Sequence, residues 1–283
     1  MFSQKTIACS QLFVISGLSP LRIEHDYDDA FYENNRVDAV AMERLTSSKF
    51  IMDMYAFCGM TVVTDFAGRE VSDVAKFMNP TDRLDLAIKV AQGIADMHSI
   101  NDRPSLVHND INLANLVITQ DNRPVLNDFN IAVLLMKHNE TGETCPFVQH
   151  FPNPQWRAPE EQVLDEANPP TNVTEKADIY AFGNVLYRLT VGSSPWKRPG
   201  AVRLEADEKE IVARLKFYNG SMPNIPEEVI ASRDPAIQTM LQAMYSAYRF
   251  NPAKRPSAAQ IVKYLQNSLD AIRKNQTDRY IRQ

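Results

Sequence analysis

A short segment at residues 106–115 constrains the fold of this chain more than any other feature, because it begins a fixed series of polar groups. Asp110 is followed by Asn115 after five positions and by Asp128 after eighteen. A site that handles a nucleoside triphosphate needs one carboxylate to orient the attacking hydroxyl. It also needs an amide and a second carboxylate to hold magnesium against the phosphates. The spacing therefore predicts a phosphoryl-transfer site.

The residues between Asn115 and Asp128 predict how these groups are held. Two β-prone runs, 116–118 and 124–126, flank a polar stretch and favour a hairpin. Such a hairpin places Asn115 and Asp128 on the same side of the ribbon. A lone Asp or Asn before a strand is more often a turn former or a cap than a catalytic residue. The ordered set of polar groups is what favours a function.

Three motifs resemble the signature of the eukaryotic protein kinases, which is His-Arg-Asp-Leu-x-x-x-Asn, Asp-Phe-Gly and Ala-Pro-Glu. The chain has His-Asn-Asp at 108–110 with Asn115, Asp-Phe-Asn at 128–130 and Ala-Pro-Glu at 158–160. The resemblance extends from about residue 38 to the C-terminus. It implies an α+β fold with two lobes, a reduced N-terminal β lobe and a large helical C-terminal lobe.

Further residues match structural roles in that family. Asp178 resembles an acid on a buried helix that caps the backbone of the catalytic loop, and His108 resembles a ring packed in the core beneath the site. Arg255 matches an arginine that pairs with the glutamate of Ala-Pro-Glu, here Glu160. If that pair is buried, removing one partner costs about 3–5 kcal/mol, because the other charge is stranded. A solvated pair would contribute very little.

Hydrophobic periodicity agrees with a helical second half. Apolar residues recur at helical intervals in five segments, which predict helices at 81–98, 176–190, 207–218, 235–248 and 257–272. Upstream, the pattern predicts one helix at 36–45 and two strands at 50–57 and 61–66. We therefore expect an incomplete N-lobe at 1–66, a C-lobe at 67–272 and a C-terminal tail at 273–283.

The resemblance implies ATP and Mg as cofactors, and it assigns residues to them. The hinge between the lobes is expected to bind adenine through the backbone carbonyl of Asp65 and the backbone amide of Ala67. Val117 and Asp128 are also expected to contact the nucleotide. The implied catalytic residues are Asp110, Asn115 and Asp128, and the implied metal ligands are Asn115 and Asp128.

The departures from the family pattern lie mostly on the nucleotide side. Gly17 is the only glycine before residue 38, although a phosphate-covering loop needs several so that the backbone can approach closely. The lysine that pairs with the α and β phosphates is missing, and the nearest cation, Arg22, is bulkier and forked. Asp38 stands for the expected glutamate with one methylene less of reach. We expect weak nucleotide binding, or strands that lie upstream of this sequence.

Two departures lie in the catalytic loop. Asn109 stands where the family has an arginine that binds a phosphate on the activation segment, so switching through Thr141 or Thr144 is not expected. Asn112 stands where serine/threonine kinases have a lysine that neutralises the transferring phosphate. The loop therefore offers fewer cations to the transition state than is usual.

Three hypotheses remain open. The chain is an ATP- and Mg-dependent protein kinase that acts on a protein hydroxyl, a pseudokinase that serves as a binding or scaffold module, or a small-molecule kinase of the aminoglycoside or choline type. The protein kinase is favoured over the pseudokinase. Neighbouring acids repel each other unless a cation binds, and a protein without catalytic activity has no need of such acids. The third shares His-x-Asp-x-x-x-x-Asn, but Glu160, Asp178 and Arg255 count against it.

Composition narrows the class of partner. With 44% hydrophobic and 23% charged residues the chain is globular, and its net charge of −5 argues against nucleic acid. The expected partner is a protein substrate or signalling protein. No run approaches the roughly 20 apolar residues of a membrane helix. Three cysteines without metal-ligand spacing predict reduced thiols and a cytoplasmic protein.

Overall fold

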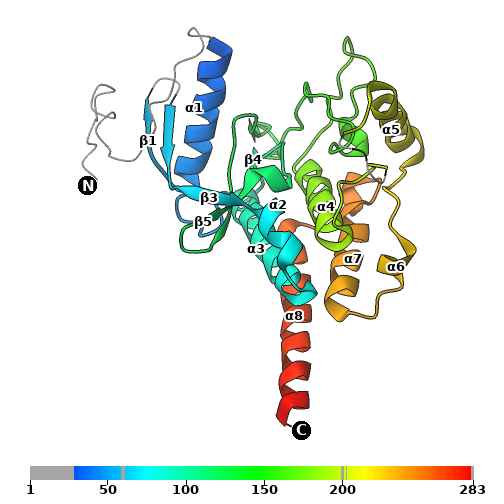
Figure 1. The fold of residues 1–283 in the computed structure, drawn as a ribbon. Helices are drawn as coiled ribbons and strands as arrows, with labels where there is room; N and C mark the ends of the chain where they lie inside the picture. Colours follow the sequence, from blue (N-terminus) through cyan, green and yellow to red (C-terminus); the bar gives the residue numbers. More distant parts are fainter. Residues whose placement is uncertain (1–28, 59–60, 199–200, 202, 282–283) are drawn as a thin grey trace.

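The computed structural model describes residues 29–58, 61–198, 201 and 203–281. The expected departures at Gly17 and Arg22 lie outside these residues. The described part contains small antiparallel sheets at one side and a group of helices at the other (Figure 1). This arrangement matches the expected α+β fold with a large helical lobe.

In its described residues, the small lobe has one helix packed on a two-stranded sheet. Its elements are α1 (Asp29–Arg44), β1 (Met54–Cys58) and β2 (Thr61–Thr64). The strands pair in antiparallel fashion, from Met54 opposite Thr64 to Cys58 opposite Thr61. The helix begins at Asp29, earlier than the predicted start at residue 36. An acidic residue in the first turn and an ion pair between Glu33 and Arg36 favour this longer helix.

Two further sheets connect the lobes. Strands β3 (Ala67–Glu70), β5 (Leu116–Thr119) and β6 (Pro124–Leu126) form one sheet in the order β3-β5-β6, while β4 (Leu106–Val107) pairs with β7 (Val133–Leu134). The predicted hairpin is present between β5 and β6, with Leu116 opposite Leu126. Its turn uses Asn122 at φ 60°, a left-handed conformation that Asn tolerates better than most residues. The hairpin brings Asn115 and Asp128 to the same end of the sheet.

The large lobe is helical, as predicted. It contains α2 (Val71–Val74), α3 (Pro80–His98), α4 (Lys176–Val191), α5 (Ala206–Asn219), α6 (Glu227–Ile230), α7 (Pro235–Ala247) and α8 (Ala258–Ile281). The side chain of Asn79 caps α3, and Gly192 ends α4 in the left-handed region at φ 82°. Helix α8 continues without a break through the region expected to be a tail.

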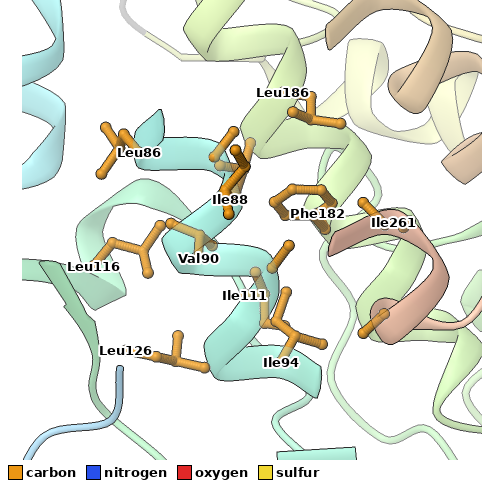
Figure 2. Close-up of a cluster of buried hydrophobic side chains, with 14 of the residues drawn as sticks. Leu86, Ile88, Val90, Ile94, Ile111, Leu116, Leu126, Phe182, Leu186 and Ile261 are labelled. Carbon is orange, nitrogen blue, oxygen red and sulfur yellow. The ribbon is translucent and has the colours of Figure 1, made fainter. Parts of the chain in front are cut away.

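The core lies around α3. Figure 2 shows Ile88 and Ile94 of this helix between the sheet residues Leu116 and Leu126 and the α4 residue Phe182. Leu116, Leu126, Ile94 and Phe182 are at most 1% exposed. Burial of each such side chain stabilises the fold by about 1.5–3 kcal/mol. The core therefore fixes the positions of α3, the hairpin and α4 relative to one another, and the catalytic loop lies between them.

The structure bears on the predicted state of the cysteines and on the expected lack of a membrane helix. Cys145 is a free thiol, but Cys58 is disulfide-bonded, so the prediction of reduced cysteines is wrong for Cys58. Among the helices of the described residues, none has the length and apolar character needed to cross a bilayer.

Candidate active site

The catalytic loop brings Asp110 and Asn115 into direct contact. Asn115 ends the short 3-10 helix η3 (Leu113–Asn115), and its Nδ2 donates to the Oδ2 and to the backbone carbonyl of Asp110, both at 2.9 Å. Asp110 is partly exposed, whereas Asn115 is buried. The amide thus fixes one carboxylate oxygen of Asp110 and leaves the other oxygen able to accept a proton or a hydrogen bond.

Asp128 reaches the same place from the far end of the hairpin. The backbone N–H of Asn127 donates to the carbonyl of Asn115 at 2.9 Å, which joins the two ends of the ribbon. Asp128 itself has a φ of 65°, and Asp adopts this left-handed conformation more readily than most residues. Its carboxylate is partly exposed and makes no hydrogen bond within the described part of the chain. Carboxylate and amide oxygens here suit a hard cation.

His108 lies beneath these groups. Its ring is fully buried, packs against Phe129 with 4.6 Å between the ring centroids, and places Nε2 3.1 Å from the carbonyl of Asn127. Burial lowers the pKa of His108, and the carboxylates of Asp178, Asp110 and Asp128 oppose that shift. The expectation of a packed, structural histidine is confirmed.

Asp178 holds the backbone of the catalytic loop, as predicted. Its Oδ2 accepts the N–H of His108 at 2.9 Å and its Oδ1 accepts the N–H of Asn109 at 3.0 Å. The ring Nε2 of His98, at the end of α3, lies 2.9 Å from the same carboxylate. Asp178 is 1% exposed and both donating residues are buried, so this carboxylate is the partner of the loop N–H groups away from bulk water. The loop is therefore fixed from α4.

The predicted pair of Arg255 and Glu160 is confirmed. Two guanidinium nitrogens of Arg255 each contact one carboxylate oxygen of Glu160, at 2.5 and 2.7 Å. The side chain of Arg255 is fully buried, and it also donates to backbone carbonyls of residues 176, 249 and 250. Bidentate geometry and burial make this a strong pair. It anchors the end of the activation segment to the large lobe.

Asn109 is bound by residues of the activation segment. Gln149 donates to its side-chain oxygen at 2.7 Å and Arg157 donates to the same oxygen at 2.8 Å. Both donors also contact Glu161, which is buried. Burial raises the pKa of Glu161, while Arg157 acts in the opposite direction. Nearby side chains thus hold the segment where the family arginine would bind a phosphate.

Asn112 has a structural part in this loop. Its side-chain oxygen accepts the N–H groups of Ala114 and Asn115, at 2.8 and 3.3 Å, and caps η3. Its Nδ2 donates to the carbonyl of Asp110 at 3.1 Å. The residue that stands for a phosphate-neutralising lysine therefore shapes the loop instead.

The small lobe meets the site through Asp38 on α1. Its Oδ1 accepts the backbone N–H of Phe129 at 2.6 Å. Burial raises the pKa of Asp38 to about 6, and the neighbouring carboxylate of Asp128 acts in the same direction. No lysine or arginine of the described residues pairs with Asp38. Sequence reasoning identified Asp38 as the counterpart of the family glutamate, without its lysine, and missed its contact with the Asp-Phe motif.

The predicted nucleotide-binding residues lie in β3, in β5 and in the segment between β2 and β3. Asp65 lies between β2 and β3, and its carboxylate accepts from the hydroxyl of Tyr55. Ala67 begins β3 opposite Thr119, and Val117 lies in the next strand opposite Glu70. All three predicted residues are partly exposed. The structure therefore places Asp65, Ala67 and Val117 on connected segments between the lobes.

These geometric features agree with the comparison to known families. The family model described as "Protein kinase domain" matches residues 28–265. The chain belongs to the protein kinase family. Its bilobal α+β fold and its catalytic loop are those of a kinase domain, and the sequence-based recognition is confirmed.

This kinase domain is similar to several kinases at 24–31% identity. The chain is 24% identical over 287 residues to the actin-regulating kinase PRK1 of Saccharomyces cerevisiae, covering 96% of this chain and 32% of that protein. It is 24% identical over 238 residues to the serine/threonine-protein kinase CTR1 of Arabidopsis thaliana, covering 81% of this chain and 26% of that protein. A probable serine/threonine-protein kinase, samkB of Dictyostelium discoideum, is 31% identical over 140 residues, covering 46% of this chain and 22% of that protein. The kinase domain therefore spans about a third or less of the length of these relatives.

One structural residue of the kinase domain gave no signal in the sequence. Lys216 of α5 is fully buried, and its ammonium donates to the carbonyls of Pro154, Gln155 and Arg157 at 2.8, 3.1 and 2.8 Å. It also lies 5.1 Å from the ring centroid of Tyr180. Burial lowers the pKa of Lys216 to about 7, with the nearby glutamates opposing the shift. The helix thus supports the segment just before the Ala-Pro-Glu motif.

Proposed function

We propose that this kinase domain transfers the terminal phosphoryl group of ATP to a hydroxyl group of a protein. The contact between Asn115 and Asp110 carries this proposal. It holds one oxygen of Asp110 and leaves the other positioned to orient an acceptor hydroxyl. Family membership supports the reaction class, and the described relatives are named as protein kinases.

The residues present suit magnesium. The Nδ2 of Asn115 is taken by Asp110, so its Oδ1 is left as a ligand, and Asp128 offers an unbonded carboxylate. Mg²⁺ is usually held by one or two such oxygens together with substrate phosphates. Burial is the main cause of the raised pKa of Asp38, and the neighbouring carboxylate of Asp128 adds to it; a cation bound at Asp128 would relieve that repulsion. Bound Mg-ATP would supply the transferable phosphoryl group and the charge that neutralises it.

The chain's own residues would act as follows. Asp110 accepts a hydrogen bond from the acceptor hydroxyl and orients its oxygen for attack. Asn115 and Asp128 hold the metal side, while Asp178 keeps the loop backbone fixed during the reaction. Asp65, Ala67 and Val117 would bind the adenine end. Because these groups are placed in advance, little reorganisation is needed at the moment of transfer.

A pseudokinase is the second candidate, and one observation favours it. Asp38 is bound to the amide of Phe129, whereas an active kinase uses the equivalent acid to hold a phosphate-binding lysine. A nucleotide placed about 1 Å from its proper position reacts on the order of a hundredfold more slowly. The small-molecule kinase reading is disfavoured by the buried pair of Arg255 and Glu160, which belongs to the protein kinase pattern.

Nucleotide binding and transfer are tested separately. Thermal unfolding would be followed during titration with Mg-ATP for the wild type, Asp128→Asn and the control Asp102→Asn, an exposed acid without a recorded contact. We expect a concentration-dependent rise in Tm that is lost in Asp128→Asn and in EDTA, and kept in the control. Transfer of labelled phosphate to a mixture of casein and myelin basic protein is expected to fall at least a hundredfold in Asp110→Asn.

The outcomes separate the candidates. A rise in Tm without transfer would support a nucleotide-binding pseudokinase. No rise in the wild type, even at millimolar Mg-ATP, would end the proposal of an ATP-dependent enzyme for this chain. Equal transfer by the wild type and Asp110→Asn would refute the role given to Asp110.

A further inference from the structure

Arg188 lies near the C-terminal end of α4 and lines two hollows of the large lobe. The smaller is a cavity of about 40 Å³ that also touches Leu113, three residues after Asp110. The larger is a groove of about 1220 Å³ that runs on past the end of α4. Arg188 and Gly192 line both hollows, so the two adjoin each other at the end of α4. We call the two adjoining hollows the path; its smaller end includes Leu113 of η3.

The small cavity is surrounded by cations. Lys76, Arg83 and Arg188 all line it. Arg83 is fixed by hydrogen bonds to the carbonyls of Met78 and Leu189, at 3.0 and 3.1 Å, and Lys76 forms an exposed ion pair at 3.1 Å. Its volume is several times what a single water molecule needs, and it accommodates a carboxylate. The cavity is therefore suited to an anionic group.

Arg188 is the cation without a partner. Within the described part of the chain its side chain makes no hydrogen bond and no ion pair. Burial lowers its pKa, and the carboxylate of Glu70 attracts it only from a distance. Glu70 is itself bound by the hydroxyl of Ser72 at 3.0 Å, and the nearby Asp73 is paired with Lys76. A half-buried guanidinium without a side-chain partner has donors left to bind an anion.

The groove beyond Arg188 is lined by both apolar and polar residues. Its walls include Val191, Trp196, Met222, Ile225 and Ile230. Met222 and Ile230 are 41% and 50% exposed. A second cation, Lys197, lines the groove and has no recorded partner among the described residues. The groove therefore offers apolar surface together with positive charge.

We propose that this path binds an extended segment of a protein substrate that carries an acidic side chain. Arg188 takes the anionic group, which is a carboxylate or a phosphate, and the groove takes an apolar side chain further along the segment. A guanidinium binds either anion through two parallel hydrogen bonds, which also orients the segment. The position beside Leu113 brings a neighbouring hydroxyl towards Asp110. Transfer to that hydroxyl rests on the proposed function, whereas binding in the path does not.

A positional peptide library tests the proposal. Each peptide would carry one serine, threonine or tyrosine at the centre and one fixed residue at a defined distance: alanine, lysine, glutamate or phosphoserine. The full chain would be assayed in two ways, for phosphate transfer in Mg-ATP and for binding to the immobilised peptides without nucleotide. The variants would be Arg188→Glu, Arg188→Gln and the control Arg103→Glu, an exposed arginine without a recorded contact.

We expect glutamate or phosphoserine, at one position or more, to raise the signal at least fivefold over alanine. Arg188→Gln should abolish this preference, and Arg188→Glu should reverse it towards lysine, while Arg103→Glu should behave as the wild type. The glutamate and phosphoserine arms tell the two anion sources apart. Equal Tm values for the wild type and Arg188→Gln would show that the change is not a folding defect.

Three results would count against the proposal. No preference for an anion, or a preference that survives in Arg188→Glu, would overturn it. Absence of both transfer and binding with every peptide would also overturn it. Binding with an acidic preference but without transfer would support the path and refute only the proposed function.

Discussion

The catalytic loop and helix α1 reach the same site from opposite lobes, but they are held very differently. In the large lobe, buried Asp178 accepts two loop N–H groups, and Asn109 receives further hydrogen bonds from the activation segment. In the small lobe, the described residues of α1 offer the site one hydrogen bond, from Phe129 to Asp38. Among the described residues, the large lobe therefore supplies most of the contacts that hold the 106–115 loop.

This difference separates the placement of the acidic side chains from the ability to transfer phosphate. A chain can keep its catalytic acids in place through contacts of the large lobe alone, because those contacts are buried and mutually supporting. Whether such a chain transfers phosphate then depends on the small lobe, which must help to position ATP. The titration with Mg-ATP discriminates the enzyme from the scaffold more sharply than loop geometry does.

The largest expected effect tests how rigidly the large lobe is held. Arg255→Ala removes the buried partner of Glu160 and leaves several carbonyls without a donor. We expect a loss of about 3–5 kcal/mol in the free energy of unfolding, because the remaining charge is stranded. Chemical denaturation followed by circular dichroism measures this loss.

A matched arginine provides the control. Arg214 forms an exposed pair with Glu210 at 2.9 Å on α5, so Arg214→Ala should cost no more than about 0.5 kcal/mol. Similar losses for the two variants would show that the pair of Arg255 and Glu160 is solvated and anchors nothing.

A second test makes the same substitution in both lobes. In Asp178→Asn an amide N–H₂ must face one of the loop N–H groups, so we expect a loss of about 1–3 kcal/mol. In Asp38→Asn the amide oxygen can still accept from Phe129, and no charge is buried, so the stability should change by less than about 0.5 kcal/mol. Denaturation and hydrogen exchange of residues 106–115 would be compared. A larger loss in Asp38→Asn would reverse the comparison between the lobes.

Features that belong to a sequence motif or to a periodic apolar pattern could be predicted from the sequence. The cap at Asp178 and the pair of Arg255 and Glu160 were predicted because each belongs to a motif with a definite residue type. Apolar periodicity predicted the five longer helices of the large lobe, α3, α4, α5, α7 and α8, but not the four-residue helices α2 and α6. The early start of α1 was missed because its first turns are acidic and aromatic, without an apolar face, and an ion pair and the helix dipole support them.

Contacts between distant residues without a local pattern were not predictable. Lys216 looks like any solvated lysine of a helix, and its burial depends on carbonyls about 60 residues earlier in the chain. Arg157 and Gln149 gave no signal, because only the fold brings them to Asn109. The contact between Asp38 and Phe129 likewise depends on how α1 packs. Such contacts are set by tertiary structure and are invisible to periodicity or spacing.

The smallest expected effect concerns pH and the small lobe. The pKa of Asp38 is raised to about 6 in the fold, mainly by burial, against about 3.9 in an unfolded chain. Between these values the folded protein binds the proton and the unfolded chain does not. Stability from this group is therefore complete below pH 4 and is lost as pH rises through 6.

Denaturation at pH 7, 6 and 5 would be compared for the wild type and Asp38→Asn, with Asp102→Asn as the control. On acidification the wild type should gain stability relative to Asp38→Asn. Because the carboxylate is partly exposed, solvent screening keeps that gain below about 1 kcal/mol. The control should follow the wild type throughout. A constant difference between wild type and Asp38→Asn would mean that Asp38 titrates as it does in water. The small lobe would then approach the Asp-Phe motif without burying its acid there, and the contrast between the lobes would be greater still.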